Sequence, residues 1–272
     1  ATFPDTAASG AFSVIVDTPI TVGTLSVTAT ADPDYSINGA SALTFDNGGT
    51  ATLTPSSKDS STTSWSVPMV LTDTVNVTIS SSSSIVTLAG DISGSGGFNI
   101  DTGAGSGSEL RFSGTNTFSG ALNIQGGTIG VDSSSSIPSG VEVTVGEFDS
   151  VTLKLADGVD FSEDITDENG NGLEFQVEEG DAATFSGVLT GENIDKLGGG
   201  TLTLSGANDY ASGTSIQEGI VVADNNNSFG LADNTNDIDM ANGTRIIIND
   251  GITIGNQINL TGTCTIEVGM SA

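Results

Sequence analysis

The residues of this chain that are best suited to chemistry lie in an acidic loop. Asp167, Asn169 and Asn171 alternate with other residues up to Gly172, and Glu178 follows after five intervening residues. Carboxylate and amide oxygens at this spacing match the loop with which many proteins surround a calcium ion. The sequence therefore predicts a calcium site at Asp167, Asn169, Asn171 and Glu178.

A second interpretation of the loop stays open, because its surroundings do not fit a helical calcium motif. Such a loop normally lies between two helices, whereas residues 173–177 alternate apolar and polar side chains as a strand does. A glycine-rich turn without a metal, or a non-helical calcium turn that uses Asp167, Asn169 and Asn171, explains the same residues. Residues 157–181 carry ten acidic side chains and no Lys or Arg, so divalent cations are expected to steady this region.

Acid–base and nucleophilic catalysis find little support in the composition. The chain has no histidine, so its many serines lack the ordinary base that would activate them. With 34 Asp and Glu, carboxylate pairs at the spacing of a glycosidase arise by chance. The five basic residues are too scattered to suggest a lyase site: Lys58, Arg111, Lys154, Lys196 and Arg245. We therefore expect no catalytic residue and no required cofactor.

The strong negative charge narrows the range of partners. Five Lys and Arg against 34 Asp and Glu give a net charge of −29. Nucleic acids and anionic membrane surfaces are disfavoured as partners, because both require a basic face. One cysteine, Cys264, and no histidine leave zinc without its usual ligands, and Cys264 is expected in the core. The acids are expected either to keep a long β surface soluble or to collect cations.

Short alternating apolar segments indicate the elements that must hold these residues in place. Residues 12–16, 75–79, 141–145 and 244–248 are rich in β-branched side chains and end near Gly, Asn, Asp or Ser. No window keeps the apolar spacing of an amphipathic helix, and no apolar run approaches the length of a membrane span. The chain is therefore expected to be all-β, without membrane insertion.

Internal repetition selects one all-β architecture from several. The segment 110–118, Leu-Arg-Phe-Ser-Gly-Thr-Asn-Thr-Phe, recurs 92 residues later as 202–210, Leu-Thr-Leu-Ser-Gly-Ala-Asn-Asp-Tyr. A sandwich or a barrel gains nothing from a long tandem repeat, whereas a parallel β-solenoid stacks like on like, with coils of about 20–25 residues. We expect one continuous solenoid with an N-terminal section 1–84 and repeat units 85–179 and 180–272.

The sequence of the repeat resembles that of a known family. Residues 197–222 read Leu-Gly-Gly-Gly-Thr-Leu-Thr-Leu-Ser-Gly-Ala-Asn-Asp-Tyr-Ala-Ser-Gly-Thr-Ser-Ile-Gln-Glu-Gly-Ile-Val-Val, and residues 108–129 hold a degenerate copy. This text resembles the autotransporter-associated β-strand repeat, also called the passenger-associated transport repeat. The resemblance implies a right-handed parallel β-helix (β-solenoid) on a large secreted or surface-displayed bacterial protein. It does not imply an enzyme, because the repeat is a scaffold that carries many functions.

Two functions are expected on such a scaffold. The first is a structural or adhesive extracellular solenoid of a bacterial surface protein, or a self-assembling fibre, without catalysis. Its expected partners are other copies of itself end to end, a larger chain of the same solenoid, or surface glycans. Residues 270–272 end without an evident cap, so we expect either a longer chain or neighbouring copies to cover the strand edges there.

The alternative function is a polysaccharide-binding or polysaccharide-degrading β-helix. Its candidate sugar-stacking residues are Tyr35, Trp65, Phe118 and Tyr210. Phe118 and Tyr210 occupy equivalent positions in the two copies of the repeat, which favours a stacked structural role for them instead.

Millimolar calcium is expected to raise the melting temperature of the protein, because the bound ion would offset the repulsion between carboxylates on adjacent coils. Thermal unfolding followed by circular dichroism, with calcium and then with a chelator, measures the effect. Asp167→Ala removes a predicted ligand and is expected to abolish the rise. A melting curve that calcium leaves unchanged would contradict the predicted site.

Overall fold

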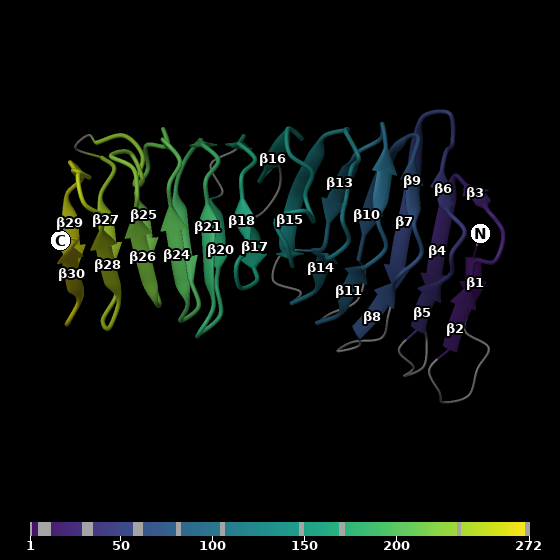
Figure 1. Cartoon of the computed structure of the whole chain (residues 1–272), viewed down its shortest axis with the longest axis horizontal. Helices are drawn as coiled ribbons and strands as arrows, with labels where there is room; N and C mark the ends of the chain where they lie inside the picture. The colour runs from purple at the N-terminus through teal and green to yellow at the C-terminus, as the bar shows by residue number, and fades with distance from the viewer. Residues whose placement is uncertain are drawn as a thin grey trace. The chain divides into compact units, whose positions relative to one another are not determined.

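The described part of the chain consists of β-strands, turns and bends. The computed structural model describes residues 2–4, 12–28, 35–56, 62–79, 83–103, 107–146, 150–168, 172–232 and 235–269. Within these residues every regular element is a strand (Figure 1), so none of them forms a helix that could cross a membrane. The expectation of an all-β chain is confirmed.

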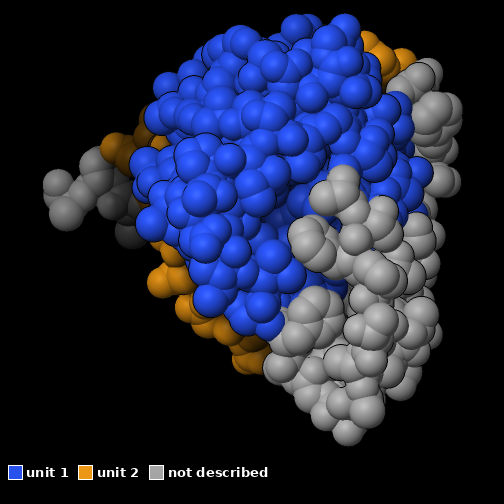
Figure 2. Space-filling model, turned by 90° about the vertical axis from the view of Figure 1, so that its right-hand side faces the viewer, with its two compact units in different colours: residues 1–131, 135–142 blue, residues 132–134, 143–272 orange. Residues whose placement is uncertain are grey.

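The chain folds as two compact units. Unit 1 comprises residues 1–131 and 135–142, and unit 2 comprises residues 132–134 and 143–272 (Figure 2). The sections 1–84, 85–179 and 180–272 that the repeat suggests describe where the sequence recurs, and they stay a prediction.

Unit 1 stacks its strands in three parallel columns. The first column holds β1 (Thr2–Pro4), β4 (Thr24–Thr28), β7 (Thr50–Ser56), β10 (Thr74–Thr78), β13 (Phe98–Asp101) and the first half of β15 (Leu122–Val131). The second holds β2 (Phe12–Ile15), β5 (Tyr35–Asn38), β8 (Thr62–Trp65), β11 (Ile85–Leu88), β14 (Glu109–Phe112) and the second half of β15. The third holds β3 (Ile20–Val22), β6 (Leu43–Phe45), β9 (Met69–Leu71) and β12 (Ile92–Gly94).

Unit 2 also stacks its strands in three parallel columns. The first holds β16 (Val143–Val145), β19 (Ile165–Asp167) and β22 (Leu189–Thr190). The second holds β17 (Val151–Leu155), β20 (Leu173–Gln176), β23 (Ile194–Leu197), β25 (Thr214–Ile216), β27 (Ile238–Met240) and β29 (Ile258–Leu260). The third holds β18 (Asp160–Phe161), β21 (Ala182–Phe185), β24 (Thr201–Leu204), β26 (Ile220–Ala223), β28 (Arg245–Ile248) and β30 (Thr265–Val268).

Each unit is therefore a parallel β-solenoid, and the register gives the length of its coils. Tyr35 lies beside Phe12, which is 23 residues earlier. Among the described strands the longest steps are of 28 residues, as from Ser36 to Ser64, and the shortest are of 19 residues, as from Thr201 to Ile220. Most coils have the predicted length, and the longer and shorter ones differ in their turns, because a change inside a strand would exchange its buried and exposed faces.

Aliphatic and aromatic side chains fill the interior of both units. In unit 1 the ring of Phe98 packs edge-on against Phe112 and Phe118, with ring centroids 5.5 and 5.4 Å apart. In unit 2 the rings of Phe175 and Phe185 lie 5.0 Å apart. Phe98 and Phe112, like Phe175 and Phe185, come from strands of different columns, so these rings meet across the interior that the columns enclose.

Glycine permits close approach of neighbouring coils at several corners, of which Gly90 is a clear case. Its amide donates a hydrogen bond of 2.9 Å to the carbonyl of Trp65 in the preceding coil. A Cβ atom at Gly90 would lie 2.0 Å from the carbonyl oxygen of Val67, which is backbone and cannot turn aside. The corner therefore requires a residue without a side chain.

Gly90→Ala is expected to destabilise the protein by about 1–3 kcal/mol, because the methyl group forces two coils apart. Gly49→Ala is the matched control, since a Cβ atom there meets nothing within 4 Å, and we expect it to change stability by less than about 0.5 kcal/mol. Urea unfolding of both variants measures the difference. Equal stabilities would show that the corner relaxes freely.

Candidate functional site

The repeat places one buried asparagine at the corner that follows its first strand. In unit 2, Oδ1 of Asn208 accepts the amide of Leu189 at 2.8 Å, and Nδ2 donates to the carbonyl of Ser228 at 2.9 Å. The side chain of Asn208 is fully buried. Because Leu189 and Ser228 belong to the coils on either side, this single amide joins three successive coils.

The same arrangement recurs in unit 1. Oδ1 of Asn116 accepts the amide of Ile92 at 2.8 Å, and Nδ2 donates to the carbonyl of Ser136 at 2.6 Å. The two corners are equivalent in hydrogen bonding as well as in sequence. The sequence shared by the two copies of the repeat thus encodes a cross-coil clamp, since a carboxamide carries its donor and its acceptor on separate atoms of one short side chain.

The aromatic residue of each repeat lies inside the solenoid. Phe118 and Tyr210 are 1% and 0% exposed, and the hydroxyl of Tyr210 bonds Oγ1 of Thr214 at 2.5 Å. Tyr35 and Trp65 are also buried, 2% and 0% exposed. None of these four residues presents a ring to a sugar, so the predicted stacking platform is wrong for them. For Tyr35 and Trp65 the alternation of β5 and β8 decides this, because both residues take inward positions of their strands.

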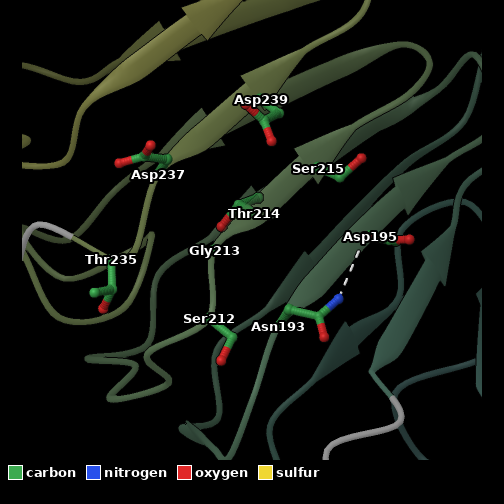
Figure 3. A pocket seen from close by; sticks show the side chains of 9 residues that line it. All are labelled: Asn193, Asp195, Ser212, Gly213, Thr214, Ser215, Thr235, Asp237 and Asp239. Atoms are coloured by element: carbon green, nitrogen blue, oxygen red, sulfur yellow. Dashed lines mark hydrogen bonds between the residues drawn. The ribbon is translucent and has the colours of Figure 1, made fainter.

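An open groove crosses the outer face of unit 2 (Figure 3). It has a volume of about 240 Å³, and we call it the aspartate groove. Strands β23, β25 and β27 and the turns before them supply its lining residues: Asn193, Asp195, Ser212, Gly213, Thr214, Ser215, Thr235, Asp237 and Asp239. Its walls are hydroxyl, amide and carboxylate groups, and none of the described residues that line it is Lys or Arg.

The carboxylates of the aspartate groove are held by amide side chains. Burial raises the pKa of Asp195, and the negative charge of Glu174 on the adjacent strand raises it further. Asn193 and Gln217 donate to Asp195 at 3.4 and 3.1 Å and partly offset this effect. The groove can therefore accept hydrogen bonds from hydroxyl or amino groups and attracts positive charge.

Asp237 and Asp239 face the groove from the next coil. Nδ2 of Asn259 donates to both carboxylates, at 3.2 and 2.9 Å. One amide nitrogen therefore bonds two carboxylates. Asp237 lies directly before β27, and Asp239 lies within it. Their oxygens keep further lone pairs for a ligand, because each carboxylate accepts several hydrogen bonds.

A second open groove lies at the turn that leads from the second column of unit 2 to the third. We call it the glutamate groove, and its volume is about 480 Å³. Its lining residues are Gln176, Glu178, Glu179, Leu197, Gly198, Gly199, Gln217 and Glu218. Lys154 forms an ion pair of 2.9 Å with Glu178 and lowers the pKa of that carboxyl.

Lys196 lies beside this groove in an unexpected position. The side chain is 0% exposed, although the neighbouring Leu197 is only half-buried. Nζ of Lys196 donates to the carbonyls of Leu197 and Gly198 at 2.7 and 2.6 Å. Composition indicated only a scattered basic residue here. The sequence signal for the burial of Lys196 is the alternation of β23, which puts Ile194 and Lys196 on one face of the strand.

The residues of the predicted calcium site are only partly described. Asp167 ends β19 and is buried, whereas Glu178 faces the glutamate groove and pairs with Lys154. Asn169 and Asn171 lie outside the described residues. Among the residues that are described, no group of three or more Asp, Glu or Cys is arranged to hold a metal ion. The calcium site stays a prediction.

Many acids close turns by accepting backbone amides from the next coil. Asp91 accepts the amide of Thr115 at 2.9 Å, and Asp164 accepts that of Val188 at 2.8 Å. Asp73 accepts the amides of Asn47 and Gly49 from the preceding coil, and these hydrogen bonds lower its pKa. Part of the negative charge therefore serves the fold, because a short carboxylate satisfies turn amides that the strands leave unpaired.

Cys264 lies in a turn before β30 instead of in the core. It is half-buried, and its Sγ approaches the carbonyls of Met240 and Ala241 at 3.5 and 3.2 Å. The expectation of a core cysteine is wrong, because Cys264 lies in the turn before β30, a strand whose residues are all exposed.

Comparison with known families agrees with the geometry of the two corners. Residues 102–131 and 194–223 match the passenger-associated-transport-repeat family. The two matches include Asn116 and Asn208 and the strands that surround them. Neither the curated proteins nor the solved structures contain a match to the chain.

Asn208→Ala is expected to destabilise the protein by about 2–4 kcal/mol, because it leaves a buried amide and a buried carbonyl without partners. Asn249→Ala is the matched control, since its half-buried side chain donates to Asp224 at 2.6 Å and does not join three coils. We expect the control to cost less than about 1 kcal/mol. Denaturant unfolding of both variants tests this, and similar losses would refute the clamp.

The repeat and the fold fit a passenger protein, the part of an autotransporter that is secreted or displayed at the cell surface. Both matched segments form strands of a parallel β-solenoid, and each holds its coils together through the same buried asparagine. The chain thus carries two passenger-associated transport repeats, one in each of its two β-solenoid units.

Proposed function

We propose that this chain is a structural and adhesive segment of a bacterial surface passenger, without catalytic activity. The observation that carries the proposal is the pair of passenger-associated transport repeats on a parallel β-solenoid. Such a scaffold displays long rows of side chains at a fixed spacing, which suits repeated weak contacts with a surface.

The chemistry of the grooves supports a role without catalysis. The chain contains no histidine, and the acids of the aspartate groove are held by amide side chains. A base or nucleophile normally has a partner that activates it. Carboxylates lie near the hydroxyls of the aspartate groove, but they form a row along successive coils. A row of this kind differs from the pairing of a nucleophile with its activating base.

Exposed apolar side chains support association with another coil of the same kind. Leu260 and Val268, on β29 and β30, are 54% and 65% exposed, and Ile15 on β2 is 70% exposed. A further coil would cover such residues and pair the strand edges beside them. That coil belongs either to a longer chain or to a second copy.

Glycan binding is the second candidate function, and the aspartate groove favours it. Amide, hydroxyl and carboxylate groups in one open groove match the hydroxyls of a sugar. The absence of a basic residue from its lining favours neutral or positively charged sugars over acidic ones, because like charges repel. The burial of Tyr35, Trp65, Phe118 and Tyr210 limits the affinity of each contact.

Electron microscopy of the purified chain at increasing concentration is expected to show rods that join end to end, because apolar strand edges gain burial on contact. Val268→Asp should shorten the filaments, whereas the control Thr265→Asp, at an exposed polar position of the same strand, should leave them unchanged. Discrete rods at every concentration would contradict assembly.

The same protein, immobilised on beads, tests adhesion and catalysis. We expect it to retain neutral glycans from an array and to release no reducing sugar from them. Release of sugar or of unsaturated products would overturn the absence of catalysis. Failure to bind any glycan or cell surface would overturn the adhesive role and leave a structural scaffold.

A further inference from the structure

Lys196 occupies a core position of the second repeat. In the ladder of the second column it lies between Phe175 of β20 and Ile216 of β25. Both neighbours are fully buried apolar residues, and Lys196 itself is 0% exposed. An ammonium group in such a column loses its hydration, which costs free energy unless other groups replace the water.

Backbone carbonyls replace that water on one side only. Leu197 and Gly198 accept from Nζ at 2.7 and 2.6 Å, within the turn that follows Lys196. The backbone carbonyl of Glu218 in the next coil accepts from Nζ at 3.4 Å, a longer and weaker contact. Lys196 therefore forms hydrogen bonds to the glycine-rich turn that follows it and contacts the next coil.

The turn around the amine is packed closely against the backbone of the next coil. A Cβ atom at Gly219 would lie 2.4 Å from the carbonyl oxygen of Gly200 and 2.6 Å from that of Gly198. Residues 198–200 and 219 thus lie backbone against backbone. Movement of the lysine side chain out of the core has to displace this turn.

Charged groups surround the amine on the outer side. Glu218, which follows β25, and Glu178, which follows β20, both favour the protonated form of Lys196. Glu178 is itself paired with Lys154 of β17. On its own strand, Asp195 points outward and receives a hydrogen bond from Gln217. Burial outweighs the glutamates and lowers the pKa of Lys196 to about 8.

The glutamate groove offers the ammonium a second place to bind. Glu178, Glu179 and Glu218 line it together with Leu197, Gly198 and Gly199, the residues that cover Lys196. An ammonium that turns outward through this turn exchanges carbonyl oxygens for carboxylates and water. Two discrete positions for one side chain are the requirement for a switch.

We propose that Lys196 is a latch operated by pH: its amine inside the column holds the turn of residues 197–200 closed, and a bound proton favours movement of that amine to the glutamate groove, which opens the turn. The opened turn separates from residues 217–219 of the next coil and exposes the floor of the glutamate groove. The passenger repeat thereby gains a local response to pH that leaves the strands of the solenoid paired.

The direction of the response follows from proton linkage. In the open state the amine is hydrated and titrates near its ordinary value of 10.5, whereas in the closed state it titrates near 8. Below about pH 8 both states carry the proton and the equilibrium is constant. Above it the closed state gains up to about tenfold in population per pH unit, because only the open state keeps the proton.

Hydrogen exchange of the whole protein, followed by mass spectrometry and corrected for the intrinsic rate, tests the latch. Protection of residues 197–200 and 217–219 is expected to be constant below about pH 8 and to rise up to about tenfold per unit towards pH 10. Lys196→Met carries no proton and should give a flat profile. Lys58→Met removes a lysine of unit 1, whereas the glutamate groove belongs to unit 2, and should keep the rise.

A second measurement keeps the proposal testable even where Lys196→Met fails to fold. The carbon next to Nζ of each lysine reports its protonation by nuclear magnetic resonance, and in the wild type one lysine should titrate near 8. A lysine set that titrates wholly above 10, or protection that does not change with pH in the wild type, would overturn the latch. The same rise in Lys196→Met would assign it to another group and overturn it too.

Discussion

Each unit depends on the parallel ladder between successive coils. Backbone amides and carbonyls pair from coil to coil, so an inward residue lies directly above its counterpart, as Leu202 lies above Ala183 and below Val221. The spacing of the ladder is fixed by the backbone. Core side chains, corner residues and outer rows all have to conform to it, which explains why the same residue types recur at the same positions.

The corners contain backbone groups that the strand ladder leaves without hydrogen-bond partners. Where the chain leaves the ladder, amides and carbonyls lose their partners, and an unpaired buried group is costly. Asn116 and Asn208 solve this with one side chain each, and Asp91 and Asp164 solve it for single amides. The acidity of the chain and the wording of its repeat thus have a common structural basis at the turns.

Lys196 shows how the register of the ladder can place a charged residue at a core position. The alternation of β23 directs Ile194 and Lys196 inward and leaves Asp195 and Leu197 outside. Carbonyls of the following turn stabilise the amine, so the core contains a titratable group beside the acidic glutamate groove. The aspartate groove arises differently, from acids and amides on outward positions of successive coils.

The sequence by itself determined the all-β class, the parallel stacking and the family of the repeat, because alternation and tandem recurrence are local properties that survive without knowledge of contacts. It also singled out the corner residues near 116 and 208 as repeated text. Only the tertiary structure decided which face each residue takes: it buried Tyr35 and Trp65, placed Lys196 inside, and assembled the aspartate groove from three strands. These outcomes depend on the register between coils, which joins residues about 20 or more positions apart and leaves no local signal.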